Sequence, residues 1–167
     1  ISYSLSERVR SFIKIQDGCG YNCSYCTIPN ARGKSRSFNI NQTIGEIKNI
    51  IDKGVKEIVL SGINIGDFGY QHNETLAQLL EKIELIDGLE RYRISSIEPN
   101  LLNNQILEIM SCSKKAMPHL HIPLQSGSDK ILRLMKRRYS YSDYYHTIEN
   151  VKKYLPNSCI GVDTIVG

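Results

Sequence analysis

Hydrophobic residues along this chain alternate between short continuous runs and stripes at helical spacing. The runs predict buried strands over residues 12–15, 57–61, 92–97, 119–124 and 159–166. The stripes between them are Ile44, Ile47, Ile50 and Ile51; Leu76, Leu79, Leu80 and Ile83; and Leu102, Ile106, Leu107 and Met110. Two more helices are predicted over about 129–137 and 141–154. Strands separated by helices of this length predict parallel βαβ units with right-handed crossovers.

Helix ends are marked by capping and glycine signals. Thr43 with Glu46 predicts a capping box for the first long helix, and Gly54 predicts its end. The second helix is expected to begin near Thr75 and to end before Gly88.

The fold class expected from this pattern is α/β, a partial (β/α)6 TIM-like half-barrel truncated after the fifth strand. A parallel sheet needs helices over its faces, and none follows the last strand. Residues 12–167 are therefore expected to form one core domain that is incomplete at its C-terminal end. Residues 1–11 are polar and mixed in charge, which predicts a linker from a missing upstream domain.

Composition is that of a reduced, cytoplasmic protein. The 167 residues include five cysteines, too few for a disulfide framework, and no apolar run approaches the ~20 residues that cross a bilayer. The formal net charge of +4 is compatible with a polyanionic partner, although many proteins that never bind nucleic acid share such a surplus.

Three cysteines lie close together directly after the first predicted strand. Cys19, Cys23 and Cys26 are separated by three and two residues. Three thiolates on one loop can bind three irons of a [4Fe–4S] cluster and leave the fourth iron open to a small molecule. A structural zinc site is the alternative, but it requires four ligands, and no second cysteine knuckle or histidine pair at helical spacing follows Cys26. An inert cysteine-rich turn is a third possibility.

Polar and small residues follow the other predicted strands as well. They occupy residues 61–69, 95–99 and 123–128, at the strand ends where βα barrels place their chemistry. Taken singly, each of these segments is also compatible with an ordinary βα turn.

Two longer segments resemble the radical SAM (S-adenosylmethionine) methylthiotransferase family. They are DGCGYNCSYCTIPNARGKSRS (17–37) and HIPLQSGSDKILRLMKRRYS (121–140), and the likeness extends over the chain from Phe12 onward. The run SGINIGDFG (61–69) is most similar to the branch that adds a methylthio group to carbon 2 of N6-threonylcarbamoyladenosine, next to the anticodon of tRNA. The alternative branches act on isopentenyl-adenosine in tRNA or on an aspartate of a ribosomal protein. A structural metal-binding module is the non-enzymatic alternative.

The resemblance implies a half-barrel of the radical SAM type and a set of site residues. Cys19, Cys23 and Cys26 would bind the [4Fe–4S] cluster. The residues that would contact SAM are Tyr25, Gly62, Asn64, Ser95, Glu98, Gln125, Ser126, Arg137 and Ile165, with Gly167 continuing the last motif. Arg137 is expected to bind the carboxylate or ribose of SAM. Alternatively, Lys136, Arg137 and Arg138 form a solvated face at a helix C-terminus.

The resemblance also implies partners. These are a tRNA substrate, an electron donor such as flavodoxin or ferredoxin, and a second [4Fe–4S] cluster in a missing N-terminal domain that delivers sulfur. Without that domain and the family's C-terminal RNA-binding domain, this chain alone is not expected to complete the reaction. The sequence leaves the oligomeric state open.

Several other residues have two interpretations. Arg32, Lys34 and Arg36 could contact an RNA backbone or form solvated surface. His119 and His121 are expected to form hydrogen bonds inside the barrel rather than a metal pair. The tyrosines at 139, 141, 144 and 145 are expected to pack between elements rather than to stack on RNA, and Cys112 and Cys159 are expected to be packing residues.

Overall fold

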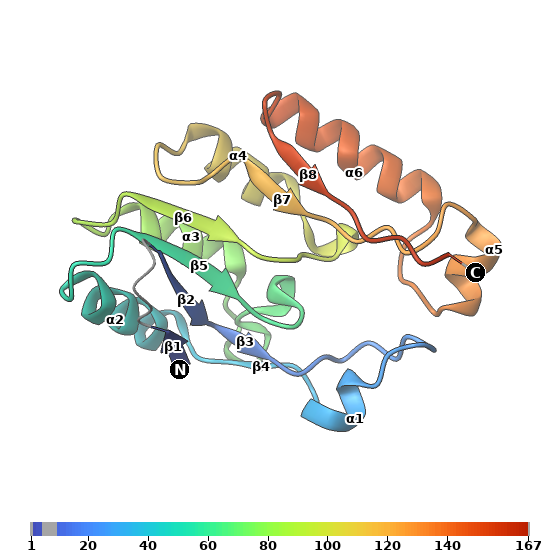
Figure 1. Cartoon of the computed structure of the whole chain (residues 1–167), viewed down its shortest axis with the longest axis horizontal. Helices are drawn as coiled ribbons and strands as arrows, with labels where there is room; N and C mark the ends of the chain where they lie inside the picture. Colours follow the sequence, from blue (N-terminus) through green and yellow to red (C-terminus); the bar gives the residue numbers. More distant parts are fainter. Residues whose placement is uncertain (1, 5–9, 167) are drawn as a thin grey trace.

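A curved parallel sheet forms the centre of the molecule. The structure is a computed structural model that describes residues 2–4 and 10–166. Within this part of the chain, the parallel strands are β2 (Arg10–Lys14), β5 (Glu57–Ser61), β6 (Arg91–Ile94), β7 (His119–His121) and β8 (Cys159–Gly161) (Figure 1). Strands β2, β5 and β6 are paired in that order, and β7 pairs with β8. Parallel bridges from Tyr92 to Ala116 and from Ser96 to His121 join the two groups. The predicted α/β half-barrel is confirmed.

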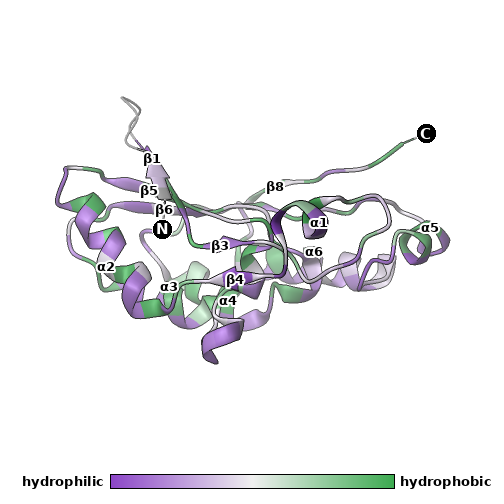
Figure 2. Ribbon diagram, turned by 90° about the horizontal axis from the view of Figure 1, so that it is seen from below, coloured by the Kyte–Doolittle hydropathy of each residue, from purple (hydrophilic) through white to green (hydrophobic). Residues whose placement is uncertain are grey.

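Helices cover one side of this sheet. The longer ones are α2 (Ile40–Ile51), α3 (Leu76–Glu84), α4 (Asn104–Cys112), α5 (Asp129–Leu134) and α6 (Tyr141–Tyr154), and α1 (Ile28–Arg32) is a short helix after the cysteines. Figure 2 shows α2, α3, α4 and α6 together beneath the strands. The core lies between these layers, where strand residues such as Ile58 and Leu60 and helix residues such as Ile47 and Leu80 are fully buried. This layer fixes the strand ends on which the site is built.

A cluster of charged side chains lies at the amino ends of three neighbouring strands. The Glu57 carboxylate accepts hydrogen bonds from Arg91 Nε at 2.9 Å and from Arg93 Nε at 2.8 Å, and Arg10 lies 4.0 Å away. Burial raises the pKa of Glu57, but these hydrogen bonds and positive charges lower it overall. The ionised carboxylate therefore ties β2, β5 and β6 together at their amino ends.

Two antiparallel pairings were not predicted. Strand β1 (Ser2–Ser4) pairs with β2, and Arg10 and Ser11 already belong to β2, so these parts of the predicted 1–11 linker are sheet. Strands β3 (Gln16–Asp17) and β4 (Arg36–Ser37) form a second short ladder. It returns the chain to the sheet after the cysteine loop, because Gln16 pairs with Ser37 and Asp17 with Arg36.

Several predicted boundaries moved. The N-cap of α2 is Asn39, which forms a capping box with Gln42; Thr43 is instead buried, and its hydroxyl donates to the Asn39 carbonyl oxygen at 2.9 Å. The predicted Thr43–Glu46 box is therefore wrong. The strand predicted over 159–166 is regular only through Gly161. Strand β5, the cap at Thr75 and helix α6 match the prediction.

Within the described residues, no helix is long and apolar enough to span a membrane.

Candidate functional site

The cysteine loop leaves the sheet at the carboxyl end of β3. Gly18 has a φ of +70°, and a Cβ there would lie 2.2 Å from the Lys34 carbonyl oxygen, so the loop needs glycine at this position. The Cys19 amide donates to the Gly33 carbonyl at 3.1 Å, and the Cys26 amide donates to the Cys23 carbonyl at 3.1 Å. Backbone hydrogen bonds therefore fix both ends of the motif.

The three thiols differ in exposure. Cys23 is buried, whereas Cys19 and Cys26 are half-buried. Burial raises the pKa of Cys19, a shift that the hydrogen bond from the Tyr21 amide partly offsets. Among the described residues, no three His, Cys, Asp or Glu side chains lie close enough to surround one metal ion. Three thiols on one short loop are the donor set that a [4Fe–4S] cluster takes when one iron has no protein ligand.

Arg137 connects the cysteine loop to the third strand end. Its side chain is 3% exposed, and Nη1 donates to Cys23 Sγ and to the Tyr25 hydroxyl, both at 3.1 Å. Its Nη2 forms an ion pair with the Glu98 carboxylate, and Nε donates to the Tyr139 hydroxyl at 3.2 Å. Burial lowers the pKa of Arg137, but the hydrogen bond and charge of Glu98 raise it overall. The alternative of a solvated face is wrong for Arg137.

Neighbouring residues of the same segment hold the loop from outside. The Arg138 guanidinium lies 3.8 Å from the centre of the Tyr21 ring and donates to the Gly20 carbonyl at 3.2 Å. The Ser24 hydroxyl donates to the Leu134 carbonyl at 2.9 Å, and the Ser24 amide donates to the Met135 carbonyl at 3.2 Å. Residues 134–138 therefore form a clamp over the cysteine loop.

Gln16 is a positioning residue that sequence reasoning missed. It is 1% exposed, and its Nε2 donates to the Gly18 carbonyl at 2.8 Å and to Ser35 Oγ at 2.9 Å. Its Oε1 accepts from the Ile63 amide at 2.9 Å and from the Asn64 amide at 2.8 Å. One side chain thus joins the cysteine loop to the loop after β5. A polar amide at a strand end directly before the cysteines was the available signal.

Gly62 and Asn64 lie against this amide. A Cβ on Gly62 would approach Gln16 Oε1 to 2.8 Å, so a larger residue would push the two loops apart. Asn64 is 2% exposed, and its Nδ2 donates to Asp67 Oδ2 at 2.9 Å. Asn64 Oδ1 and, at the end of β6, Ser95 Oγ are buried without a hydrogen-bond partner among the described residues. Buried polar atoms are nearly always paired, so both indicate a ligand or water.

The fourth and fifth strand ends meet at Gln125. This residue has a φ of +67°, and its amide donates to the Asp163 carbonyl at 2.9 Å. The Ile165 amide donates back to the Gln125 carbonyl at 2.9 Å, and the Ser126 hydroxyl accepts from the Ser128 amide at 3.3 Å. Ile165 is 47% exposed, and Gly167 lies outside the described residues. Tyr139 links this region to Arg137, because its hydroxyl donates to the Pro123 carbonyl at 2.8 Å and accepts from Arg137 Nε at 3.2 Å.

The model of the radical SAM superfamily matches residues 13–167. The chain belongs to this superfamily. Solved structures agree with the fold: a radical SAM methyltransferase, TsrM, from Kitasatospora setae, with cobalamin and a [4Fe–4S] cluster bound, superposes with a TM-score of 0.74 at 14% identity over 93% of this chain and 31% of its own. A cobalamin-dependent radical SAM enzyme, OxsB, with aqua-cobalamin bound, gives 0.72 at 13% identity over 92% and 23% of the chains.

Curated relatives are more similar in sequence. A threonylcarbamoyladenosine tRNA methylthiotransferase, MtaB, from Chlamydia pneumoniae is 39% identical over 99% of this chain, and its Bacillus subtilis counterpart is 38% identical over 98%. A tRNA-2-methylthio-N(6)-dimethylallyladenosine synthase from Lachnoclostridium phytofermentans is 39% identical over 96%. The chain spans 39%, 37% and 36% of these relatives' lengths. The predicted family resemblance is confirmed, and the relatives' names include two tRNA branches.

The three basic residues that were predicted to contact RNA follow the cysteine loop in the chain, and two of them pair with Asp17. Asp17 pairs with Arg36 at 2.7 Å, Lys14 at 3.2 Å and Arg32 at 3.4 Å, and Lys34 is exposed. Burial raises the pKa of Asp17, but the Gly18 amide, Lys14 and Arg36 lower it overall. Arg32 and Arg36 thus pair with Asp17 while their side chains stay about half exposed, which is compatible with both predicted interpretations.

The structure agrees with some of the remaining predictions and contradicts others. His121 Nδ1 lies 2.9 Å from Ser96 Oγ and Nε2 lies 3.4 Å from Asp163, which agrees with hydrogen bonding inside the barrel. Among the tyrosines, those at 139 and 144 are buried, while those at 141 and 145 are about half exposed. Cys112 and Cys159 are both exposed, so the expectation that they are packing residues is wrong. A position in a helix or strand does not by itself determine whether a side chain is buried, because such an element can have a solvent-exposed face.

Proposed function

We propose that this chain is the SAM-binding part of a tRNA methylthiotransferase that acts on carbon 2 of N6-threonylcarbamoyladenosine next to the anticodon. The observation that carries the proposal is that Arg137 contacts both Cys23 of the three-cysteine loop and Glu98 after the third strand of the sheet. Similarity to MtaB enzymes supports this substrate, and the equal identity to the dimethylallyladenosine synthase makes that tRNA branch the second candidate.

Cys19, Cys23 and Cys26 would hold a [4Fe–4S] cluster with one iron open to SAM. When bound and reduced, this group supplies the electron that cleaves SAM and yields a carbon radical able to remove hydrogen from an unactivated carbon. Arg137 would contact the carboxylate or ribose of SAM through its remaining Nη2 N–H, since its other four N–H groups donate to Glu98, Cys23, Tyr25 and Tyr139. Its Nη1 also donates to Cys23 Sγ, and this contact holds the sulfur of Cys23 in place.

The orphaned polar atoms would contact the rest of SAM. Asn64 Oδ1 can accept from the amino group of SAM, and Ser95 Oγ can exchange hydrogen bonds with it or with the ribose. Tyr25, Gly62, Gln125, Ser126 and Ile165 remain proposed contacts. Gly62 contributes by its lack of a side chain, which leaves room for the Gln16 amide to lie against the loop that carries Asn64.

The complete reaction requires partners beyond this chain. We infer a second [4Fe–4S] cluster elsewhere in the protein that delivers sulfur, an electron donor such as flavodoxin or ferredoxin, and a tRNA substrate in the cytoplasm. Arg32, Lys34 and Arg36 lie beside the cysteine loop and would contact the RNA backbone there. On its own, this radical SAM half would cleave SAM without completing methylthiolation.

Nucleoside analysis tests the proposed substrate. The gene that encodes this chain is deleted from its host, and digested tRNA is examined by mass spectrometry with and without complementation. The proposal predicts loss of 2-methylthio-N6-threonylcarbamoyladenosine and restoration by the wild type but not by Cys23→Ala. Loss of the dimethylallyladenosine derivative instead would assign the other tRNA branch, and an unchanged tRNA profile would refute both.

A further inference from the structure

Two surface clefts flank the cysteine loop and meet at one residue. The first has a volume of about 540 Å³ and the second about 590 Å³, and Gln71 lines both. Clefts of this size are typical of ligand sites. The second is also lined by Cys19, so the pair leads from the outer edge of β3 and β4 to the first cysteine.

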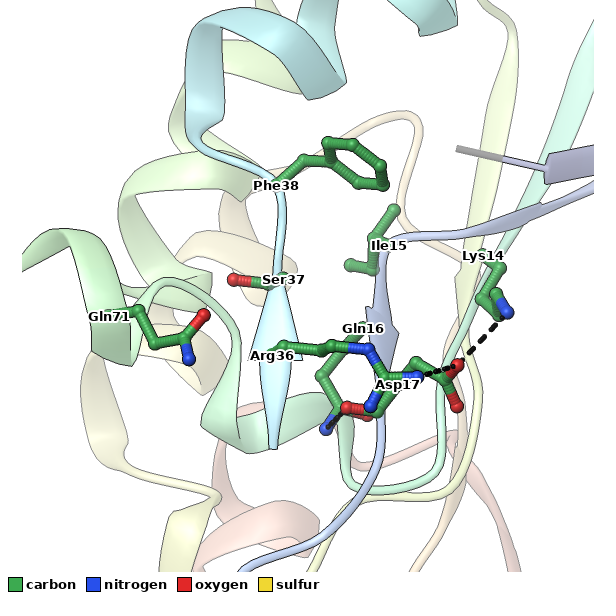
Figure 3. A pocket seen from close by; sticks show the side chains of 8 residues that line it. All are labelled: Lys14, Ile15, Gln16, Asp17, Arg36, Ser37, Phe38 and Gln71. Atoms are coloured by element: carbon green, nitrogen blue, oxygen red, sulfur yellow. Dashed lines mark hydrogen bonds and ion pairs between the residues drawn. The ribbon is translucent and has the colours of Figure 1, made fainter. Parts of the chain in front are cut away.

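The first cleft combines an exposed aromatic ring with positive charge. Figure 3 shows Phe38 next to Ile15 at one end, Gln71 across from them, and Arg36 and Lys14 beside Asp17 at the other end. Phe38 is 39% exposed although it follows a β-strand and precedes a buried helix start. An accessible aromatic ring in the same cleft as two cations can stack on a base while the cations attract the phosphate of the RNA backbone.

The second cleft repeats this combination. Tyr70 is 81% exposed, and the exposed side chains of Lys34 and Arg138 line the same space. Arg138 is held in place because it stacks on Tyr21 and donates to the Gly20 carbonyl. Each cleft therefore contains one exposed aromatic residue and two cations.

Carboxylates do not cancel the positive charge of either cleft. The first contains Asp17 and the second contains Asp67, so each keeps a surplus of one positive charge. Asp17 pairs with Lys14, Arg32 and Arg36, and this arrangement holds the cations at the rim rather than free in solvent. Asp67 is turned toward Asn64, whose amide donates to it.

We propose that the two clefts form a track for two consecutive nucleotides of single-stranded RNA, with Phe38 and Tyr70 as stacking platforms. The inference rests on the proposed function, since it places bases that flank the modified adenosine beside the cysteine loop. Stacking tolerates any base, and the shared Gln71 supplies a donor and an acceptor to a base edge between the two platforms. The track thus holds the RNA without choosing its sequence.

Binding of an unmodified anticodon stem-loop RNA to the full-length protein, followed by fluorescence anisotropy, tests the track. Phe38→Ala and Tyr70→Ala should each weaken binding about tenfold with an unchanged salt slope, and Phe38→Trp should restore it. The matched control is Tyr145→Ala, on an aromatic side chain of α6 that is 50% exposed, and it should bind like the wild type.

Charge is tested separately from stacking. Lys14→Gln should lower the slope of log affinity against log salt by about 0.7, because one phosphate contact to a single strand is lost. Lys56→Gln is its control, since Lys56 is similarly exposed and pairs with Glu90 away from the clefts. Melting temperatures of all variants separate loss of fold from loss of contact.

The outcomes separate the track from the activity itself. If the wild type modifies tRNA and binds RNA but Phe38→Ala and Tyr70→Ala bind equally well, the track is refuted and the proposed function stands. If affinity falls equally in Tyr145→Ala, the effect is not specific and the track is likewise refuted. An RNA affinity that none of these variants changes, Lys14→Gln included, would overturn the track as well.

Discussion

Removing the Arg137 side chain should destabilise the protein because it leaves the Glu98 carboxylate unpaired inside the site. Arg137 is 3% exposed and Glu98 is 16% exposed, so little water can replace the guanidinium. Arg137→Met keeps the aliphatic volume of the side chain while removing its hydrogen bonds to Glu98, Cys23, Tyr25 and Tyr139.

The magnitude follows from the cost of an unpaired buried charge. Breaking a buried ion pair by removing one partner costs about 3–5 kcal/mol, whereas replacing both partners by apolar groups is often close to neutral. Since Glu98 keeps some exposure, we expect about 3 kcal/mol for Arg137→Met. The double variant Arg137→Met, Glu98→Leu should recover about 2 kcal/mol of that loss.

Urea unfolding of the wild type, both single variants and the double variant gives the coupling free energy directly. Arg133→Met is the matched control, because Arg133 is exposed on α5, and it should change the free energy of unfolding by less than about 0.5 kcal/mol. A single-variant loss below about 1 kcal/mol, or additive effects in the double variant, would refute the description of this pair as a buried, coupled unit.

Other substitutions test the supporting contacts. Gln16→Leu should lower the free energy of unfolding in urea by about 2–4 kcal/mol, because it leaves buried backbone groups of two loops without hydrogen-bond partners. Gln105→Leu, at an exposed helix position, should be nearly neutral. Gly62→Ala should lower the free energy of unfolding by about 1–3 kcal/mol, because the added Cβ would clash with Gln16. Gly45→Ala is the control: it has open space on α2 and should raise the free energy of unfolding by about 0.5–1 kcal/mol. Equal effects of the two substitutions would contradict the packing argument. The folded-state pKa of Glu57 is lowered, so its stabilisation is present above its ordinary pKa of 4.5 and is lost as pH falls through the lower folded value. In Glu57→Gln the melting temperature should fall less steeply than in the wild type as pH is lowered through this range. An unchanged pH dependence of the melting temperature would contradict the role given to Glu57.

The strand and helix order could be predicted because it depends on local periodicity. Strand β5 is buried on both faces and reads as the continuous run EIVLS, and α6 begins at a serine whose side chain caps it. Strands β3 and β4 could not be predicted in this way. Each has two residues, and their pairing depends on a chain reversal through the cysteine loop that no local pattern records.

The site shows the same division. The spacing of Cys19, Cys23 and Cys26 is local, so the motif could be recognised directly. The contacts of Arg137 with Cys23 and Glu98 span 114 and 39 residues, so its burial could be inferred only from a family resemblance. Neither the local sequence pattern nor the family resemblance pointed to Gln16, because its five hydrogen bonds depend on how the loops after β3 and β5 lie together.

Anaerobic reconstitution with iron and sulfide tests the central claim, that three cysteines hold a four-iron cluster with one open iron. The wild type should become brown, bind four iron and four sulfide per chain, and show an altered electron paramagnetic resonance spectrum when SAM is added to the reduced protein. Alanine at Cys19, Cys23 or Cys26 should abolish this, while Cys112→Ala, at an exposed position, should retain full iron. A colourless protein with one tightly bound zinc, or full iron content without Cys23, would contradict the account.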